Sequence, residues 1–133
     1  MNKSSTTHTN MSKKILIGED SSAIQLLTKR VLEFQNYSIF SAKNGEDLLT
    51  KFEKEDFDLI LMDIGMPVMD GIKCTQKIRL LKDEKKATIP IIAITGNPNN
   101  LKLEEFKKIG FNEFISKPIN FDLLVETIKK YIS

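Results

Sequence analysis

Residues 58–63 read DLILMD, four apolar residues between two aspartates. A short apolar run without polar alternation is typical of a strand that is buried on both faces of a parallel sheet. The run ends at Asp63, and residues 64–67 (IGMP) read as a loop rather than as the start of a helix. The sequence therefore predicts a buried strand that brings one carboxylate to the edge of a sheet.

Three further apolar runs end on polar residues in the same way. Residues 13–18 are followed by Glu19-Asp20, residues 90–94 by Thr95, and residues 113–116 by Lys117-Pro118. Because ligands of open α/β sheets bind at the carboxyl ends of the strands, these side chains are expected to share one pocket. The pocket would hold carboxylates for a divalent metal, together with a hydroxyl and an ammonium for a phosphoryl group.

Segments of helical length separate the runs, and one more strand-like run occupies residues 37–42. The segments expected to be helices are 22–35, 45–54, 71–82, 98–109 and 120–132. Strands that alternate with helices imply right-handed crossovers and a parallel sheet. We therefore predict a flavodoxin-like (βα)5 fold, a three-layer α/β/α domain with a doubly wound sheet of order 2-1-3-4-5.

The bulk properties of the chain exclude several classes of protein. A length of 133 residues suits one domain, which is expected over residues 13–133. Residues 1–12 are expected to form a disordered polar tail, in which His8 is inert. A net charge of +2 does not indicate direct nucleic-acid binding, and no apolar stretch is long enough to span a membrane. The tail lacks the apolar segment of a signal peptide. Cys74 is the one cysteine, so a cytoplasmic protein is the simplest interpretation.

The three carboxylates at the ends of the first and third strands indicate a metal site. Three acids at adjacent strand ends repel one another unless a cation lies among them, and oxygen ligands select Mg²⁺ or Mn²⁺. Asp20, Asp63 and a backbone carbonyl just after Asp63 are the expected ligands, with Glu19 acting through water. The alternative that Glu19 and Asp20 only cap the following helix stays open.

Lys117, Thr95 and Gly96 are the expected phosphate-binding residues. A buried lysine needs an acid or a phosphate as its partner, and Pro118 makes a cis peptide accessible, although Lys-Pro is also a common surface turn. Thr95-Gly96 supplies a hydroxyl and an uncovered N–H for phosphoryl oxygens. Together these parts describe in-line attack of Asp63 on phosphorus. No P-loop is present, so a nucleotide is not the evident donor.

The chain resembles, over roughly residues 13–132, the CheY-like receiver domain of two-component response regulators. The resemblance rests on four motifs in order, namely Glu19-Asp20, DIGMPVMDG at 63–71, PIIAITG at 90–96 and Lys117-Pro118. Glu-Asp in place of the frequent Asp-Asp pair is similar to the receivers of hybrid sensor histidine kinases. Those receivers often continue with asparagines, which this chain lacks, so a hybrid origin stays open.

The resemblance implies that Asp63 is the phosphoacceptor of a two-component or phosphorelay system. Its phosphoryl group would come from a phosphohistidine on a sensor histidine kinase or a histidine phosphotransfer protein. Asp20, Asp63 and the Gly65 carbonyl would hold Mg²⁺, with Glu19 assisting. Such a domain is a signalling phosphoacceptor rather than an enzyme, although it assists its own phosphorylation and dephosphorylation.

The resemblance also implies a switch. Thr95 would be the switch hydroxyl, Lys117 the phosphate-binding lysine and Phe114 the switch aromatic. Phosphorylation would change the partner preference of the face formed by helix 98–109, strand 113–116 and helix 120–132. Gly65 and Asn97 fall where the family tunes dephosphorylation, and Gly96 in place of alanine should loosen its loop.

The apolar residues Ile24, Leu27, Val31 and Phe34 recur on one side of the first helix. Part of this stripe should pack on the sheet, whereas Ile24 could be exposed and dock a phosphotransfer partner. A haloacid-dehalogenase-type phosphatase is an alternative function, but it needs a second acid where this chain has Gly65. A second alternative is a degenerate receiver that only binds partners. The sequence does not identify the downstream partner or the oligomeric state.

Overall fold

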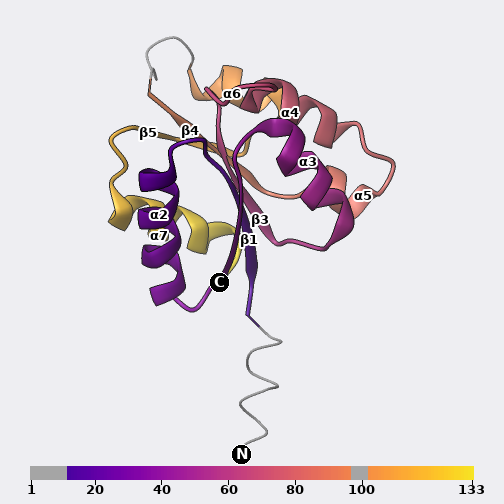
Figure 1. Cartoon of the computed structure of the whole chain (residues 1–133). Helices are drawn as coiled ribbons and strands as arrows, with labels where there is room; N and C mark the ends of the chain where they lie inside the picture. Colours follow the sequence, from indigo (N-terminus) through magenta and orange to yellow (C-terminus); the bar gives the residue numbers. More distant parts are fainter. Residues whose placement is uncertain (1–11, 97–101) are drawn as a thin grey trace, which may run out of the picture.

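The computed structural model describes residues 12–96 and 102–133. Five parallel strands form one sheet of order β2-β1-β3-β4-β5, with helices on both faces (Figure 1). The strands are β1 (Lys14–Gly18), β2 (Ser38–Ala42), β3 (Leu59–Asp63), β4 (Ile91–Thr95) and β5 (Glu113–Ser116). The helices are α2 (Ser22–Phe34), α3 (Gly45–Lys54), α4 (Gly71–Arg79), α5 (Glu84–Ala87), α6 (Leu103–Ile109) and α7 (Phe121–Tyr131). The predicted doubly wound α/β fold is confirmed.

The two faces of the sheet carry separate layers of helices (Figure 1). Helices α2 and α7 cover one face, and α3, α4, α5 and α6 cover the other. Strands β3 and β4 are buried at every position because both layers cover them. This arrangement explains why the residues of β3, such as Leu59 and Met62, show no polar alternation.

Each layer packs its own apolar cluster against the sheet. On the α3–α4–α6 side the cluster includes Phe52, Cys74 and Phe106, which are all at most 1% exposed. On the other side Leu32 of α2 and Ile128 of α7 pack on the sheet. Cys74 is therefore a packing residue.

The expectation that part of the apolar stripe of the first helix packs on the sheet is wrong, because none of its four residues is fully buried. The buried residues of α2 are Thr28 and Leu32, whereas Leu27 and Phe34 are 52% and 85% exposed. Ile24 is half-buried. The pattern of apolar residues was misleading because α2 turns a threonine, whose methyl group packs like an aliphatic side chain, towards the sheet.

The helix expected over 71–82 is shorter in the structure, and a further helix follows it. Helix α4 ends at Arg79, and α5 begins after Asp83, whose carboxylate accepts the N–H of Lys86 at 3.2 Å. For the helix expected over 98–109, the structure describes Leu103–Ile109. Asn97, His8 and the expected tail up to residue 11 lie outside the described residues. None of the described helices has the length and apolar content that crossing a bilayer requires.

Candidate functional site

The three predicted acids come together at the carboxyl edge of the sheet. Glu19 and Asp20 follow β1, and Asp63 ends β3, which pairs directly with β1. One carboxylate oxygen from each residue lies within 4.8 Å of the other two. Glu19 and Asp63 are both 4% exposed, and Asp20 faces solvent. The donors are all hard oxygens, so the cluster fits a divalent cation such as Mg²⁺.

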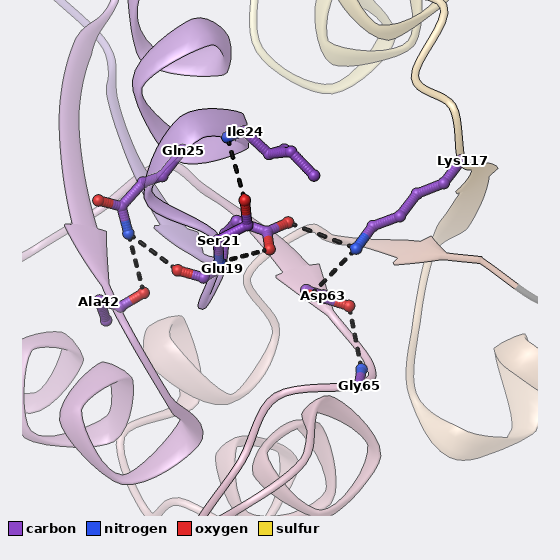
Figure 2. A network of polar contacts seen from close by, with 8 residues as sticks. All are labelled: Glu19, Ser21, Ile24, Gln25, Ala42, Asp63, Gly65 and Lys117. Carbon is purple, nitrogen blue, oxygen red and sulfur yellow. Dashed lines mark hydrogen bonds and ion pairs between the residues drawn. The ribbon is translucent and has the colours of Figure 1, made fainter.

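Ser21, not either acid, is the N-cap of α2. The Ser21 hydroxyl accepts the N–H of Ile24 at 3.3 Å, and the Ser21 N–H donates to Glu19 Oε2 at 3.0 Å (Figure 2). The serine hydroxyl thus accepts the hydrogen bond from the helix N–H that a capping carboxylate would otherwise accept. The interpretation of Glu19 and Asp20 as mere helix caps is therefore contradicted, because their carboxylates remain at the strand edge.

Lys117 reaches the acids from the other side of the pocket. Its Nζ lies 3.3 Å from Asp63 Oδ2 and 3.6 Å from Glu19 Oε1 (Figure 2). The side chain is 27% exposed, and the Lys117–Pro118 bond is cis. The alternative of an outward-facing surface turn is thereby contradicted, since the ammonium lies among the carboxylates.

Gly65 holds the second oxygen of Asp63. Its N–H donates to Asp63 Oδ1 at 3.0 Å, while Oδ2 faces Lys117. A Cβ added at Gly65 would meet only that Oδ1 within 4 Å, at 3.7 Å. The carboxylate of Asp63 is thus fixed in rotation, and Gly65 places no side chain over it.

Burial and the close approach of two carboxylates and one ammonium together determine the electrostatics of the pocket. Burial is the largest influence on Glu19 and raises its pKa from 4.5 to about 7, with the charge of Asp63 adding to the effect. The Ser21 N–H and Lys117 act in the opposite direction. For Lys117, burial lowers the pKa, but Asp63 and Glu19 together outweigh it and the pKa is raised. Lys117 therefore stays charged, and a further cation would relieve the remaining repulsion.

The remaining predicted residues, Thr95, Gly96 and Phe114, lie on or next to β4 and β5. Thr95 ends β4 and is 1% exposed, paired in register with Ser116 of β5. Among the described residues, a Cβ at Gly96 would approach Lys117 Cδ, at 4.0 Å, and no other atom within that distance. Phe114 is half-buried and stacks on Phe106 of α6 with ring centroids 4.8 Å apart.

The sequence interpretation missed Gln25. Its amide Nε2 donates to the backbone oxygens of Glu19 at 2.9 Å and Ala42 at 3.3 Å (Figure 2). Gln25 thereby ties the segment after β1 to α2 and to the end of β2. Its acceptors are backbone carbonyls, so no pattern of side chains in the sequence indicated this role.

Comparison with known proteins identifies the family. Residues 15–129 match the model of the response regulator receiver domain. The chain belongs to this family.

Two curated relatives show the range of proteins that contain such a domain. The chain is 31% identical to sporulation initiation phosphotransferase F of Bacillus subtilis, covering 92% of this chain and 95% of that protein. It is 35% identical to the CAI-1 autoinducer sensor kinase/phosphatase CqsS of Vibrio cholerae, over 90% of this chain but 17% of the kinase. The chain spans 7% and 5% of two Dictyostelium discoideum hybrid histidine kinases. It is thus a receiver homologous to phosphoacceptor domains of hybrid kinases and response regulators.

Solved structures agree with this assignment. Chemotaxis response regulator CheY4 of Vibrio cholerae matches with a TM-score of 0.83 and 28% identity, over 92% of this chain and 100% of that one. The receiver domain of the Pseudomonas aeruginosa sensor histidine kinase PA1611 matches with a TM-score of 0.82 and 28% identity, over 91% and 98%. That receiver has a magnesium ion coordinated in its active-site cleft.

Proposed function

We propose that this chain accepts a phosphoryl group on Asp63 from a phosphohistidine of a sensor histidine kinase or a histidine phosphotransfer protein. The observation that carries the proposal is the position of the Asp63 carboxylate. It lies within the acid cluster and 3.3 Å from the Lys117 ammonium. The kinship with receivers of histidine kinases supports the choice of donor. The free Cys74 fits the reducing cytoplasm, where we expect this reaction.

The acid cluster is the proposed Mg²⁺ site. Asp20, Asp63 and the Gly65 carbonyl would be the ligands, and Glu19 would act through water. Bound there, the ion would neutralise charge on the phosphoryl oxygens. Mn²⁺ prefers the same hard oxygen donors and would be an alternative ion. The magnesium in the PA1611 receiver supports the proposal for Mg²⁺.

In the proposed reaction an Asp63 oxygen attacks phosphorus in line. The O–P bond forms as the P–N bond of the phosphohistidine breaks, and the electron pair stays on the imidazole nitrogen, which takes up a proton. Lys117 would hold one equatorial oxygen, and Thr95 Oγ1 and the Gly96 N–H would hold others. The Gly65 N–H contributes by fixing the rotation of the Asp63 carboxylate before attack.

The added charge is the proposed trigger of the switch. A phosphoryl group on Asp63 brings new acceptor oxygens next to Thr95 and Lys117. Phe114 stacks on the fully buried Phe106, so a movement of Phe114 would require α6 to repack. The face formed by α6, β5 and α7 would then change its preference for partners.

An apolar groove beside the pocket is the proposed docking place of the donor. The groove has a volume of about 220 Å³ and is lined by Ile24, Leu27, Lys117, Pro118, Ile119 and Phe121. It joins the exposed side of α2 to the phosphate-binding lysine. An apolar helix of the donor placed there would bring its phosphohistidine to Asp63.

Hydrolysis of the acyl phosphate is the proposed step that resets the site: water takes the phosphoryl group as inorganic phosphate, and the Asp63 carboxylate is restored. Gly65 places no side chain over Asp63, and this would give water an approach to the acyl phosphate. A haloacid-dehalogenase-type phosphatase is not supported, because position 65 carries no acid and the family is that of receivers.

The direct test is phosphorylation by acetyl phosphate with Mg²⁺, followed by intact mass. One phosphoryl group should be added to the wild-type chain and none to Asp63→Asn. Asp70→Asn is the matched control, because Asp70 is the N-cap of α4 and asparagine caps equally well. Labelling of Asp63→Asn at the wild-type level would show that another residue is the acceptor.

A further inference from the structure

One guanidinium group joins four segments at the amino-terminal ends of β4 and β5. Arg79, the last residue of α4, donates through Nε to the Gly110 carbonyl at 2.8 Å and through Nη2 to Asn112 Oδ1 at 3.1 Å. Its Nη1 donates to the carbonyls of Ala87 at 2.9 Å and Ile89 at 2.7 Å. Arg79 therefore fixes the end of α6, the start of β5 and the segment before β4 relative to α4.

None of these four acceptors is a carboxylate. Among the described residues, no ion pair includes Arg79, and burial lowers its pKa. The charge is balanced by carbonyl and amide dipoles alone. Because the planar guanidinium presents its donors in a fixed fork, it sets the relative positions of its acceptors more strictly than a lysine would.

Gly110 forms the joint between α6 and β5. It ends α6 with a φ of 130°, a conformation that favours glycine. An added Cβ would lie 2.9 Å from Arg79 Cγ and 3.2 Å from Thr75 Cγ2. The carboxyl end of α6 is thus pressed directly against α4, where a side chain has no room.

A set of stacked rings connects α6 to β5. Phe106 of α6 stacks on Phe114 of β5 with centroids 4.8 Å apart and planes at 18°. Phe106 also meets the edge of Phe111 at 5.8 Å. A displacement of Phe114 is therefore passed to the middle of α6, whereas Arg79 restrains the end of the same helix.

The packing between α4 and α6 contains one unsatisfied group. Thr75 is fully buried next to Gly110, and its hydroxyl has no hydrogen-bond partner among the described residues. A buried hydroxyl without a partner is unfavourable, so this hydroxyl does not stabilise the observed contact between α4 and α6.

We propose that Arg79 is a positioning residue of the switch: it anchors α6 at Gly110, so that α6 turns about this end when Phe114 moves. The inference rests on the function proposed above and extends it to the path between Asp63 and the α6 surface. With the anchor in place, the response is a rotation with its largest displacement in the first turn of α6. Without it, α6 and the Gly110–Asn112 segment would shift together.

The test is amide hydrogen exchange with and without Mg²⁺ and beryllofluoride, the ligand pair of the Thermotoga maritima TrrA structure. In wild type, the response along α6 and the segment that follows it should be confined to residues 103–109, with Phe111 and Asn112 unchanged. In Arg79→Met, the exchange rates of Phe111 and Asn112 should change about fivefold on adding the ligands. In Arg79→Lys, which keeps the charge but not the forked donors, the change in exchange at Phe111 and Asn112 should lie between those of wild type and Arg79→Met. This variant replaces Arg79→Met in the test if Arg79→Met does not fold.

Lys86→Met is the matched control. Lys86 also binds backbone carbonyls, those of Phe52 at 2.7 Å and Glu55 at 2.6 Å, but it joins α5 to α3 rather than to α6. It should destabilise the domain and leave the pattern of response as in wild type. If the Arg79 variants respond like Lys86→Met, or if wild type responds equally at Asn112, the inference is wrong. Acetyl phosphate labelling of Asp63, measured separately, reports on the proposed function itself.

Discussion

The two ends of the sheet each hold a half-buried cation, and the two cations have different partners. Lys117, at the carboxyl edge, lies 3.3 Å and 3.6 Å from the carboxylates of Asp63 and Glu19. Arg79, at the opposite end, binds three backbone carbonyls and one amide oxygen. A carboxylate partner can bind a metal or a phosphoryl group instead, whereas a backbone carbonyl is held in place by the fold of its own segment. The carboxyl edge is therefore suited to chemistry, and the opposite end to holding the fold.

Replacing Lys117 should have the largest effect, and on phosphorylation. Lys117→Met removes the cation next to Asp63 and should slow labelling by acetyl phosphate about 10²–10³-fold, the range for loss of one preorganised charge partner. The rate is read by intact mass over time. Arg79→Met provides the contrast and should label at close to the wild-type rate, because it lies at the other end of the sheet. Equal loss of labelling in both variants would remove the distinction between the two ends.

Replacing Arg79 should have the next largest effect, and on stability. Arg79→Met leaves four acceptors without this donor, so we expect the free energy of unfolding to fall by about 2–3 kcal/mol. Urea denaturation with an unchanged slope measures the loss. Arg79→Lys should recover part of it. If Arg79→Met lowered the free energy of unfolding less than Lys117→Met does, the hydrogen bonds of Arg79 would contribute little to stability.

The pH dependence of stability should come from the carboxyl edge. Glu19 has a pKa of about 7 in the folded chain against 4.5 ordinarily, mainly because it is buried. Between these values the folded state binds more protons than the unfolded state, so stability falls as pH rises from 4.5 to 7 and then levels off. The expected loss is about 3 kcal/mol, and thermal unfolding across this pH range measures it.

One variant and one added ion distinguish the titration of Glu19 from that of the other acids in the domain. Glu19→Gln cannot ionise and should flatten the fall in stability over the same pH range. Added Mg²⁺ should stabilise the domain more at pH 8 than at pH 5, because a bound cation favours the ionised acids. A wild-type profile that rises between pH 5 and 7 would mean that Glu19 is already ionised in the folded chain at low pH.

The sequence predicted the carboxyl edge of the sheet far better than the opposite end. Strands β3 and β4 are uninterrupted apolar runs, and Asp63 and Thr95 mark where they end, so the positions of the site residues followed from the fold. Their roles in phosphorylation stay predictions. Arg79 gave no such signal because its acceptors, such as Gly110 and Ile89, are mostly backbone atoms of residues distant in sequence.

Helices were predicted less well where their surroundings decide the outcome. Periodicity showed that α2 has an apolar side, but Leu27 and Phe34 lie outside and Thr28 lies inside. The short helix α5 was missed because four residues, Glu84–Ala87, give no periodic pattern. Its N-cap, Asp83, was the one local signal for it.

The smallest expected effect compares two glycines, one at each end of the sheet. Gly110→Ala places a Cβ 2.9 Å from Arg79 Cγ at a φ of 130° and should lower stability by about 1–2 kcal/mol. Gly65→Ala meets only Asp63 Oδ1 at 3.7 Å and should stay within about 0.5 kcal/mol of wild type. Urea denaturation of both variants measures the difference. If Gly65→Ala were the more damaging, the loop beside Asp63 would be the rigid part of the domain, and the contrast between a chemical end and a structural end would be reversed.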